Sequence, residues 1–291
     1  MGLSLFLQTC GRIVSNPGVA TVPALFRHVL WHPTRRLHPI PMHIPLTQRS
    51  KIHLAHRAEI NGCIALAWSQ RLYDYHNMSF LLEITRHPDF SPVCFDIGAN
   101  LGPYSLLLSE SPNVTVYAFE PHPSTAASLR RNLELNQRER VHVQTCALSD
   151  FSGSIQFTDS AFDPTNRVMC TEESAGQGIE VECITGSDFC EEIDVTPQLL
   201  KIDTEGHEVA VLRGFGSLLK KVKIILLEEN VSRIEIQEVL PSDTFIGPLY
   251  VDHPKRRLTR QKHRHEDALY LNRSAVKELA TMGYKLEESS H

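Results

Sequence analysis

The sequence predicts an α/β protein built on a doubly wound parallel sheet. From about residue 92, apolar runs of strand length alternate with segments of helical periodicity. These runs are apolar on both faces, which is typical of parallel strands covered by helices on each side. A glycine-bearing turn from Asp96 to Gly102 follows the first run, at the strand-to-helix junction where such folds bind ligands.

Each expected element has a local signal. Apolar runs predict strands at residues 93–97, 114–119, 141–148, 152–158, 179–184, 199–202, 224–227, 246–251 and 268–271. Intervening segments predict helices at residues 103–108, 124–135 and 209–219. Pro103 stands in the first turn of its helix, where a missing N–H is harmless.

The sequence divides into four parts. Residues 1–58 have no acidic residue and carry seven basic ones, which are Arg12, Arg27, Arg35, Arg36, Arg49, Lys51 and Arg57. Their proline content predicts a basic, irregular extension that packs on the domain or on a partner, and an organelle transit peptide is the alternative. Residues 59–91 are expected to be a helical lead-in, residues 92–273 the main domain, and residues 274–291 a C-terminal helix and tail.

Composition limits the classes of partner. The chain is 42% hydrophobic and 22% charged, as in soluble globular proteins. Its net charge of -5 argues against a general nucleic-acid binder, so no DNA partner is expected. The seven cysteines form no CxxC pair, which indicates reduced thiols and a cytoplasmic location. No apolar run approaches the ~20 residues of a membrane span.

The glycine turn predicts a nucleoside site without a phosphate. Its spacing is Gly-x-x-x-Gly, so the Gly-x-Gly-x-x-Gly fingerprint that holds a pyrophosphate is absent. Asp96 adds a negative charge that would repel phosphate and attract a cationic ligand. Glu120 ends the next strand, about twenty residues on, where a carboxylate accepts both ribose hydroxyls. Adenosine with a cationic amino-acid tail and no phosphate describes S-adenosylmethionine.

Several further motifs make the sequence similar to the FkbM family of methyltransferases. They occur in this order: FDIGANLG at 95–102, FEP at 119–121, NLELN at 132–136, ALSD at 147–150 and KIDTEGHE at 201–208. The resemblance covers about residues 90–230. It implies a class I methyltransferase (Rossmann-like) fold with a seven-stranded sheet whose last strand is antiparallel. It also implies O-methylation of hydroxyls on natural products, sugars or related small molecules.

The resemblance also implies which residues bind the cofactor. Asp96, Gly98, Asn100 and Gly102 would line its methionine half, with Ala99 inside the same turn. Glu120 would hold the ribose, followed by Pro121. Cys146, Ala147 and Leu148 would approach the adenine.

The catalytic candidates follow the strand at residues 199–202. Ligands in open α/β sheets bind beyond the carboxyl ends of the strands, so Asp203, Glu205 and His207 are expected near the transferring methyl group. Any of the three could serve as general base for the acceptor hydroxyl. The alternative is that Glu205 and Glu208 merely suit a helix N-terminus.

No metal is expected. The alternative is a magnesium site of the catechol O-methyltransferase type, for which Asp203, Glu229 and Asn230 are the candidates. The basic link between the last two expected strands carries Arg256, Arg257 and Arg260, which would bind an anionic acceptor; the alternative is a solvated loop.

The predicted function is methyl transfer to a hydroxyl of a small molecule or sugar. The basic N-terminus and link leave an RNA- or protein-directed methyltransferase as one alternative. A non-catalytic module with the same fold is the other. No Asn-Pro-Pro-Tyr or Pro-Cys motif is present, which favours an oxygen acceptor.

Overall fold

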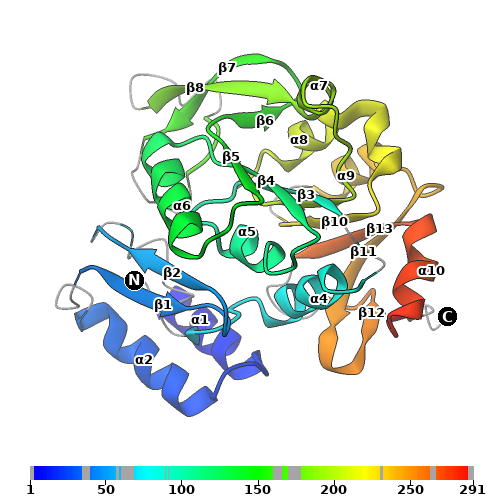
Figure 1. The fold of residues 1–291 in the computed structure, drawn as a ribbon. Helices are drawn as coiled ribbons and strands as arrows, with labels where there is room; N and C mark the ends of the chain where they lie inside the picture. The colour runs from blue at the N-terminus through cyan, green and yellow to red at the C-terminus, as the bar shows by residue number, and fades with distance from the viewer. Residues whose placement is uncertain are drawn as a thin grey trace.

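The computed structural model describes residues 3–34, 40–56, 59, 69–88, 90, 92–159, 166–169, 178–229, 232–262 and 267–287. Its main feature is one large mixed sheet of strand order β14-β12-β11-β13-β10-β9-β3-β4-β5, with helices on both faces (Figure 1). Among the described residues, no helix has both the length and the apolar character needed to cross a bilayer.

Seven strands form the body of the sheet. The parallel strands are β3 (Val93–Ile97), β4 (Thr115–Phe119), β5 (Val141–Gln144), β9 (Leu199–Ile202) and β10 (Ile224–Leu227). The last strand, β13 (Ala268–Asn272), runs antiparallel between β10 and β11 (Phe245–Asp252). The predicted class I methyltransferase sheet with its antiparallel last strand is thus confirmed. Two short strands, β12 (Arg257–Thr259) and β14 (Lys285–Leu286), extend its edge.

The strands bury alternate side chains on two different faces. Along β10, Ile224 and Leu226 pack on one face, whereas Ile225 and Leu227 pack on the other. The first face is covered by α4 (Tyr75–Thr85), α5 (Pro103–Leu108), α6 (Pro123–Leu135) and α10 (Arg273–Thr281). The second is covered by α7 (Gly186–Glu192), α8 (Glu208–Phe215) and α9 (Arg233–Val239). This alternation decides which polar side chains reach the same side of the sheet.

One predicted strand is divided in the structure. We expected a single strand at residues 141–148, but β5 ends at Gln144, opposite the last residue of β4. Beyond that point the chain leaves the large sheet and turns into β6 (Ala147–Ser149). A separate small sheet pairs β6 with β8 (Gly178–Thr185), and β8 with β7 (Gly153–Thr158). The predicted helix at 209–219 likewise ends early, at Phe215, and continues as a 3₁₀ turn, Gly216–Lys221.

The N-terminal extension of residues 1–58, which we expected to be helical or irregular, has regular structure over most of its length. It contains α1 (Leu3–Ser15), α2 (Thr21–Thr34) and a hairpin of β1 (Met42–Pro45) with β2 (Lys51–Leu54). Two of the prolines are compatible with the helices, because Pro17 lies between them and Pro23 lies in the first turn of α2. Of the expected lead-in at 59–91, residues 60–68 lie outside the described part of the chain, and α4 forms within the remainder.

Candidate functional site

A cavity of about 300 Å³ opens at the carboxyl ends of β3, β4, β9 and β10. This is where the strand order reverses between β3 and β9, the position at which open α/β sheets bind ligands. Most of the predicted cofactor and catalytic residues line it, namely Asp96, Gly98, Ala99, Asn100, Glu120, Pro121, Cys146, Ala147, Leu148, Asp203, Glu205 and His207. Gly102 is not among the lining residues.

The glycine turn is shaped by contacts within the protein. Gly98 has φ +79°, and a Cβ there would lie 1.8 Å from the carbonyl oxygen of Asp203. Gly102 has φ +89°, and a Cβ there would lie 2.3 Å from Leu129. Only glycine fits such positions. The two glycines therefore let the turn pack against the end of β9 and against α6, and Gly98 also lines the cavity.

The side chain of Glu120 forms hydrogen bonds with the segments that follow β3 and β4. One carboxylate oxygen accepts a hydrogen bond from the backbone N–H of Asn100 at 2.9 Å, and the other accepts from the N–H of His122 at 3.0 Å. Burial raises the pKa of Glu120 to about 7, although both hydrogen bonds favour the ionised form. The carboxylate is held rigidly at the cavity wall, and each of its oxygens retains a further lone pair for a ligand.

Asp96 is buried at the end of β3. Its Oδ2 accepts a hydrogen bond of 2.5 Å from the hydroxyl of Ser105, in the first turns of α5. Burial raises its pKa, although the charge of Lys201 opposes this effect. A cationic ligand in the cavity would favour the ionised form further.

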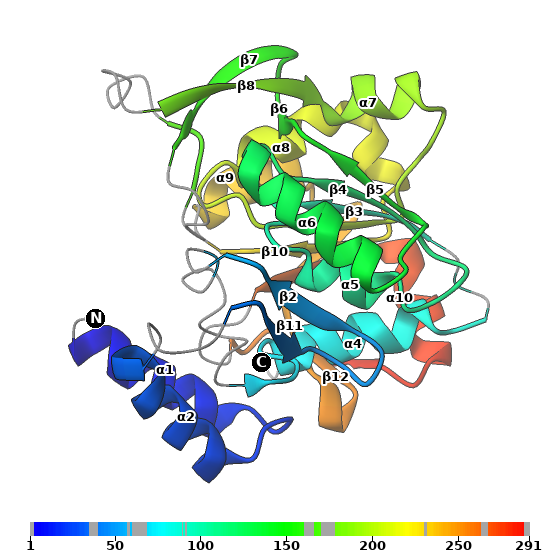
Figure 2. The same cartoon turned by 60° about the vertical axis from the view of Figure 1, so that its left-hand side comes forward.

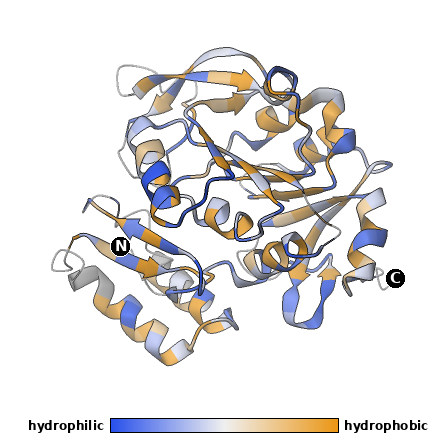
Figure 3. Ribbon diagram, in the orientation of Figure 1, coloured by the Kyte–Doolittle hydropathy of each residue, from blue (hydrophilic) through white to orange (hydrophobic). Residues whose placement is uncertain are grey.

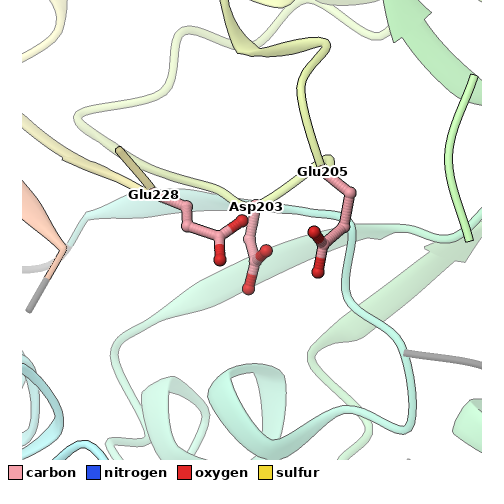
Figure 4. Close-up of side chains that lie close together, drawn as sticks. All are labelled: Asp203, Glu205 and Glu228. Carbon is pink, nitrogen blue, oxygen red and sulfur yellow. The ribbon is translucent and has the colours of Figure 1, made fainter. Parts of the chain in front are cut away.

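Three acidic side chains meet beyond β9 and β10. Ligand oxygens of Asp203, Glu205 and Glu228 all lie within 4.8 Å of one another (Figure 4). The ammonium group of Lys201 donates a hydrogen bond to Asp203 Oδ2 at 2.5 Å, and only 2% of its side chain is exposed. A buried cation thus already neutralises part of this acidic group.

The charges of this group are unequally distributed. Burial disfavours the charged form of Asp203, but Lys201 and a hydrogen bond with Glu228 outweigh it and lower the pKa of Asp203. Burial, with the charge and hydrogen bond of Asp203, raises the pKa of Glu228 to about 10. Burial also opposes the charge on Lys201, yet Asp203, Asp267 and Asp96 raise its pKa. At neutral pH, Asp203 is ionised, Glu228 is protonated and Lys201 is charged.

The other two catalytic candidates have different surroundings. Glu205 lines the cavity from a loop that Glu208 organises, because Glu208 Oε1 accepts hydrogen bonds from the N–H groups of Thr204 and Gly206 at 3.0 Å. His207 lies 3.0 Å from the hydroxyl of Ser149 on β6. Burial lowers the pKa of His207, so its ring is neutral at pH 7.

The alternative magnesium site included Glu229, but the glutamate that lies beside Asp203 is Glu228. Glu229 is directed to the opposite face of the sheet, where it pairs with Arg233 at 3.0 Å and Lys262 and accepts a hydrogen bond of 2.9 Å from Tyr250. Successive side chains alternate, so Glu228 takes the side that Asp203 occupies. Asn230 lies outside the described residues.

The three arginines predicted to bind the acceptor do not line the cavity. Arg256 pairs with Glu83 of α4 and donates to the carbonyl oxygen of Met282. Arg257 pairs with Asp252 and with Glu287. Arg260 is exposed. We correct this assignment, because Arg256 and Arg257 fasten the β11–β12 hairpin to α4 and the C-terminal segment.

Sequence reasoning missed several cavity residues. They are Arg12, Tyr73, Tyr104, Phe157, Asn166, Val168 and Glu228. Tyr104 lies under the ammonium of Lys201, 4.9 Å from ring centroid to Nζ, and donates a hydrogen bond to half-buried Asp74. Its place directly after the glycine turn and Pro103 was a usable signal. Arg12 comes from α1, and no local pattern connects it to the site.

Comparison with known proteins agrees with this geometry. Residues 96–267 match the methyltransferase FkbM domain family. The chain is 33% identical over 151 residues to hexuronic acid methyltransferase AglP of Haloferax volcanii, covering 51% of this chain and 59% of that protein. It is 32% identical over 153 residues to 31-O-demethyl-FK506 methyltransferase FkbM of Streptomyces tacrolimicus, covering 42% and 58%.

A third relative is 2-O-methyltransferase NoeI of Sinorhizobium fredii, 28% identical over 165 residues, with 51% of this chain and 66% of that protein covered. The chain thus spans about three fifths of the length of the first relatives it matches, 59% and 58%. The family match spans more than half of the 291 residues, and the chain belongs to the methyltransferase FkbM domain family.

Proposed function

We propose that this protein transfers a methyl group from S-adenosylmethionine to a hydroxyl group of a sugar or other small molecule. The observation that carries the proposal is one cavity lined both by buried Asp96 and Glu120 and by ionised Asp203. The first pair suits a nucleoside with a cationic tail, and Asp203 suits an acceptor hydroxyl.

The residues of the cavity fit the proposed cofactor. Glu120 offers two buried carboxylate oxygens for the two ribose hydroxyls. Asp96 offers a negative charge to the methionine end, and Cys146, Ala147 and Leu148 offer a largely apolar wall to the adenine. The volume of about 300 Å³ falls within the usual range for small-molecule sites. S-adenosylmethionine supplies an activated methyl group when bound.

Asp203 is the proposed general base. It is ionised at neutral pH, and 36% of its side chain is exposed, so an acceptor hydroxyl can reach it. The ammonium group of Lys201 fixes the position of the Asp203 carboxylate through a hydrogen bond. Glu228 retains its own proton and so acts as a hydrogen-bond donor. His207, held by Ser149 beside β6, would contact the adenosine half instead.

We further propose that methyl transfer needs no metal. Asp203, Glu205 and Glu228 are close enough to hold a divalent ion, but Lys201 already contributes a positive charge there and Glu228 is protonated. Activity should therefore persist in excess chelator. Loss of activity with chelator, and its return with Mg²⁺, would overturn this part of the proposal.

The cavity favours an acceptor that is rich in hydroxyl groups and carries no phosphate. Its described lining holds five carboxyl groups, those of Asp96, Glu120, Asp203, Glu205 and Glu228, against the cations Arg12 and Lys201. This balance opposes phosphate-bearing acceptors, RNA included. The names of the relatives AglP and NoeI, a hexuronic acid methyltransferase and a 2-O-methyltransferase, support a sugar hydroxyl.

The test is transfer of labelled methyl groups into a panel of sugars, nucleotide sugars, lipids and RNA, with and without chelator. Asp96→Asn keeps the shape of the site and should abolish cofactor binding measured by calorimetry. Asp243→Ala, at an exposed carboxylate outside the cavity, is the matched control. Undiminished cofactor binding by Asp96→Asn would refute the assignment, and label only in RNA would refute the acceptor class.

A further inference from the structure

Exposed apolar side chains are concentrated on α1 and α2. Among the described residues, six of the nine exposed large hydrophobic side chains belong to these helices, namely Leu7, Val14, Val22, Phe26, Val29 and Leu30. The four on α2 follow helical spacing and share one face. Figure 3 shows apolar segments along α2 at the edge of the molecule. Soluble monomers rarely gather apolar side chains in this way, so the face requires a partner.

The opposite face of this helical pair attaches it to the main domain. Ile13 and Ala24 are fully buried in a small cluster that includes Tyr73. The side-chain amide of Asn16 donates hydrogen bonds of 3.1 Å to the carbonyl oxygens of Leu72 and Tyr73. The pair thus has a fixed orientation, and it projects from one corner of the molecule (Figure 2).

Charge identifies the kind of partner. Residues 1–58 carry seven basic and no acidic residues, a net charge of +7. Residues 59–291 carry the remaining 22 basic and all 34 acidic residues, a net charge of -12, and the two parts sum to -5. Of the basic residues that the structure describes in this segment, Arg12 and Arg27 lie on the two helices, whereas Arg49 and Lys51 lie in the β1–β2 hairpin. A basic segment without acidic residues, on an otherwise anionic protein, is attracted to an anionic surface. A second copy would present the same positive charge and be repelled.

We infer that the exposed face of α1 and α2 docks on an anionic lipid bilayer. Interfacial helices combine an apolar face, which enters the boundary between headgroups and acyl chains, with basic residues that contact acidic headgroups. The face built from Val22, Phe26, Val29 and Leu30 supplies the first. Arg12 on α1 and Arg27 on α2, in a segment without acidic residues, supply the second. A charged, apolar face of this kind lies on the membrane and does not span it.

Docking would place the cavity beside the membrane. Arg12 belongs both to α1 and to the cavity lining, so the helix that meets the lipid also borders the site. If the proposed methyl transfer holds, on which this consequence rests, the acceptor is the sugar of a phosphate-free glycolipid at the bilayer surface. The docking itself is tested without turnover, so the two ideas fail separately.

The experiment is co-sedimentation of the full chain with vesicles. Phosphatidylcholine mixed with phosphatidylglycerol should retain the protein, whereas phosphatidylcholine alone should not. Salt of about 1 M, which shortens the Debye length to about 3 Å, should release most of it. Retention that is independent of lipid charge and salt, or no retention, would overturn the inference.

Matched substitutions locate the contact. Val22 and Phe26 are 77% and 65% exposed, so Val22→Glu and Phe26→Glu leave the core intact and should each weaken vesicle binding about tenfold or more. Ile234→Glu, at a residue of α9 that is 71% exposed, should bind like the wild type. Thermal melting checks that all three fold. Equal binding by all three variants would refute the assigned face, as would self-association through it without vesicle binding.

Discussion

The carboxyl group of Glu228 donates a hydrogen bond to the carboxylate of Asp203, at the ends of two neighbouring parallel strands. Two partly buried acids this close disfavour each other's ionisation, so one retains its proton. Lys201 determines which one, because its ammonium contacts Asp203 at 2.5 Å. The ionised Asp203 carboxylate, which can accept a proton, therefore lies beside the neutral Glu228 carboxyl group, which donates a hydrogen bond.

The pH dependence of stability should reveal the proton on Glu228. Its pKa of about 10 in the folded protein exceeds the value of about 4.3 in an unfolded chain. The folded state therefore binds the extra proton between these values, and the resulting stabilisation is lost as pH rises through that window. Glu228→Gln removes this dependence, so its unfolding free energy relative to wild type should increase with pH. Urea denaturation across that range measures it, and parallel profiles would contradict it.

Cofactor affinity should depend on the ionisation of Glu120, whose pKa burial raises to about 7. Only the carboxylate accepts hydrogen bonds from both ribose hydroxyls, so the Kd for S-adenosylhomocysteine should rise about tenfold per pH unit below the pKa. Glu120→Gln should bind about tenfold more weakly above that pH and lose the dependence on pH. Calorimetry on both sides of the pKa tests this. A wild-type affinity that does not vary with pH would exclude Glu120 from the ribose site.

Lys201 should matter to stability far more than a surface lysine. Only 2% of its side chain is exposed, and its removal leaves buried carboxylates without compensation, so Lys201→Met should cost about 3–5 kcal/mol of unfolding free energy. Lys223 pairs with Glu278 with 33% and 42% of the two side chains exposed. Lys223→Met should cost about 1 kcal/mol or less. If urea denaturation gave the same loss of unfolding free energy for both variants, the buried charge of Lys201 would not be needed to compensate the neighbouring carboxylates.

The two paired arginines of the β11–β12 hairpin should not affect acceptor binding. Arg256→Gln and Arg257→Gln each break a partly exposed ion pair, so each should cost about 1 kcal/mol or less and leave the acceptor KM unchanged. Arg12→Gln, which changes the cavity lining, is the contrasting variant and should alter KM. Steady-state kinetics together with denaturation separate the two effects. A raised KM in either hairpin variant would restore the acceptor role predicted for it.

Local sequence determined the sheet and the cofactor half of the cavity. The bounds of β3, β9 and β10 follow from apolar runs that only Asp96 in β3 and Lys201 in β9 interrupt, since a strand buried on both faces has few polar positions. Asp96 and Glu120 were identifiable because each ends such a run, and carboxyl ends of parallel strands meet at one edge. These signals are local, and a single sequence carries them in full.

Tertiary structure alone decided which acidic side chains meet beyond β9 and β10 and where the N-terminal helices lie. The choice between Glu228 and Glu229 depends on which face of β10 each side chain takes, and therefore on register with Lys201 and Asp203 of β9. The charge state of Lys201 depends on Asp96, Asp203 and Asp267, which folding brings together from distant segments. Arg12 reaches the cavity for the same reason. Electrostatic interactions act through space, so residues far apart in the chain set the chemistry that no local pattern records.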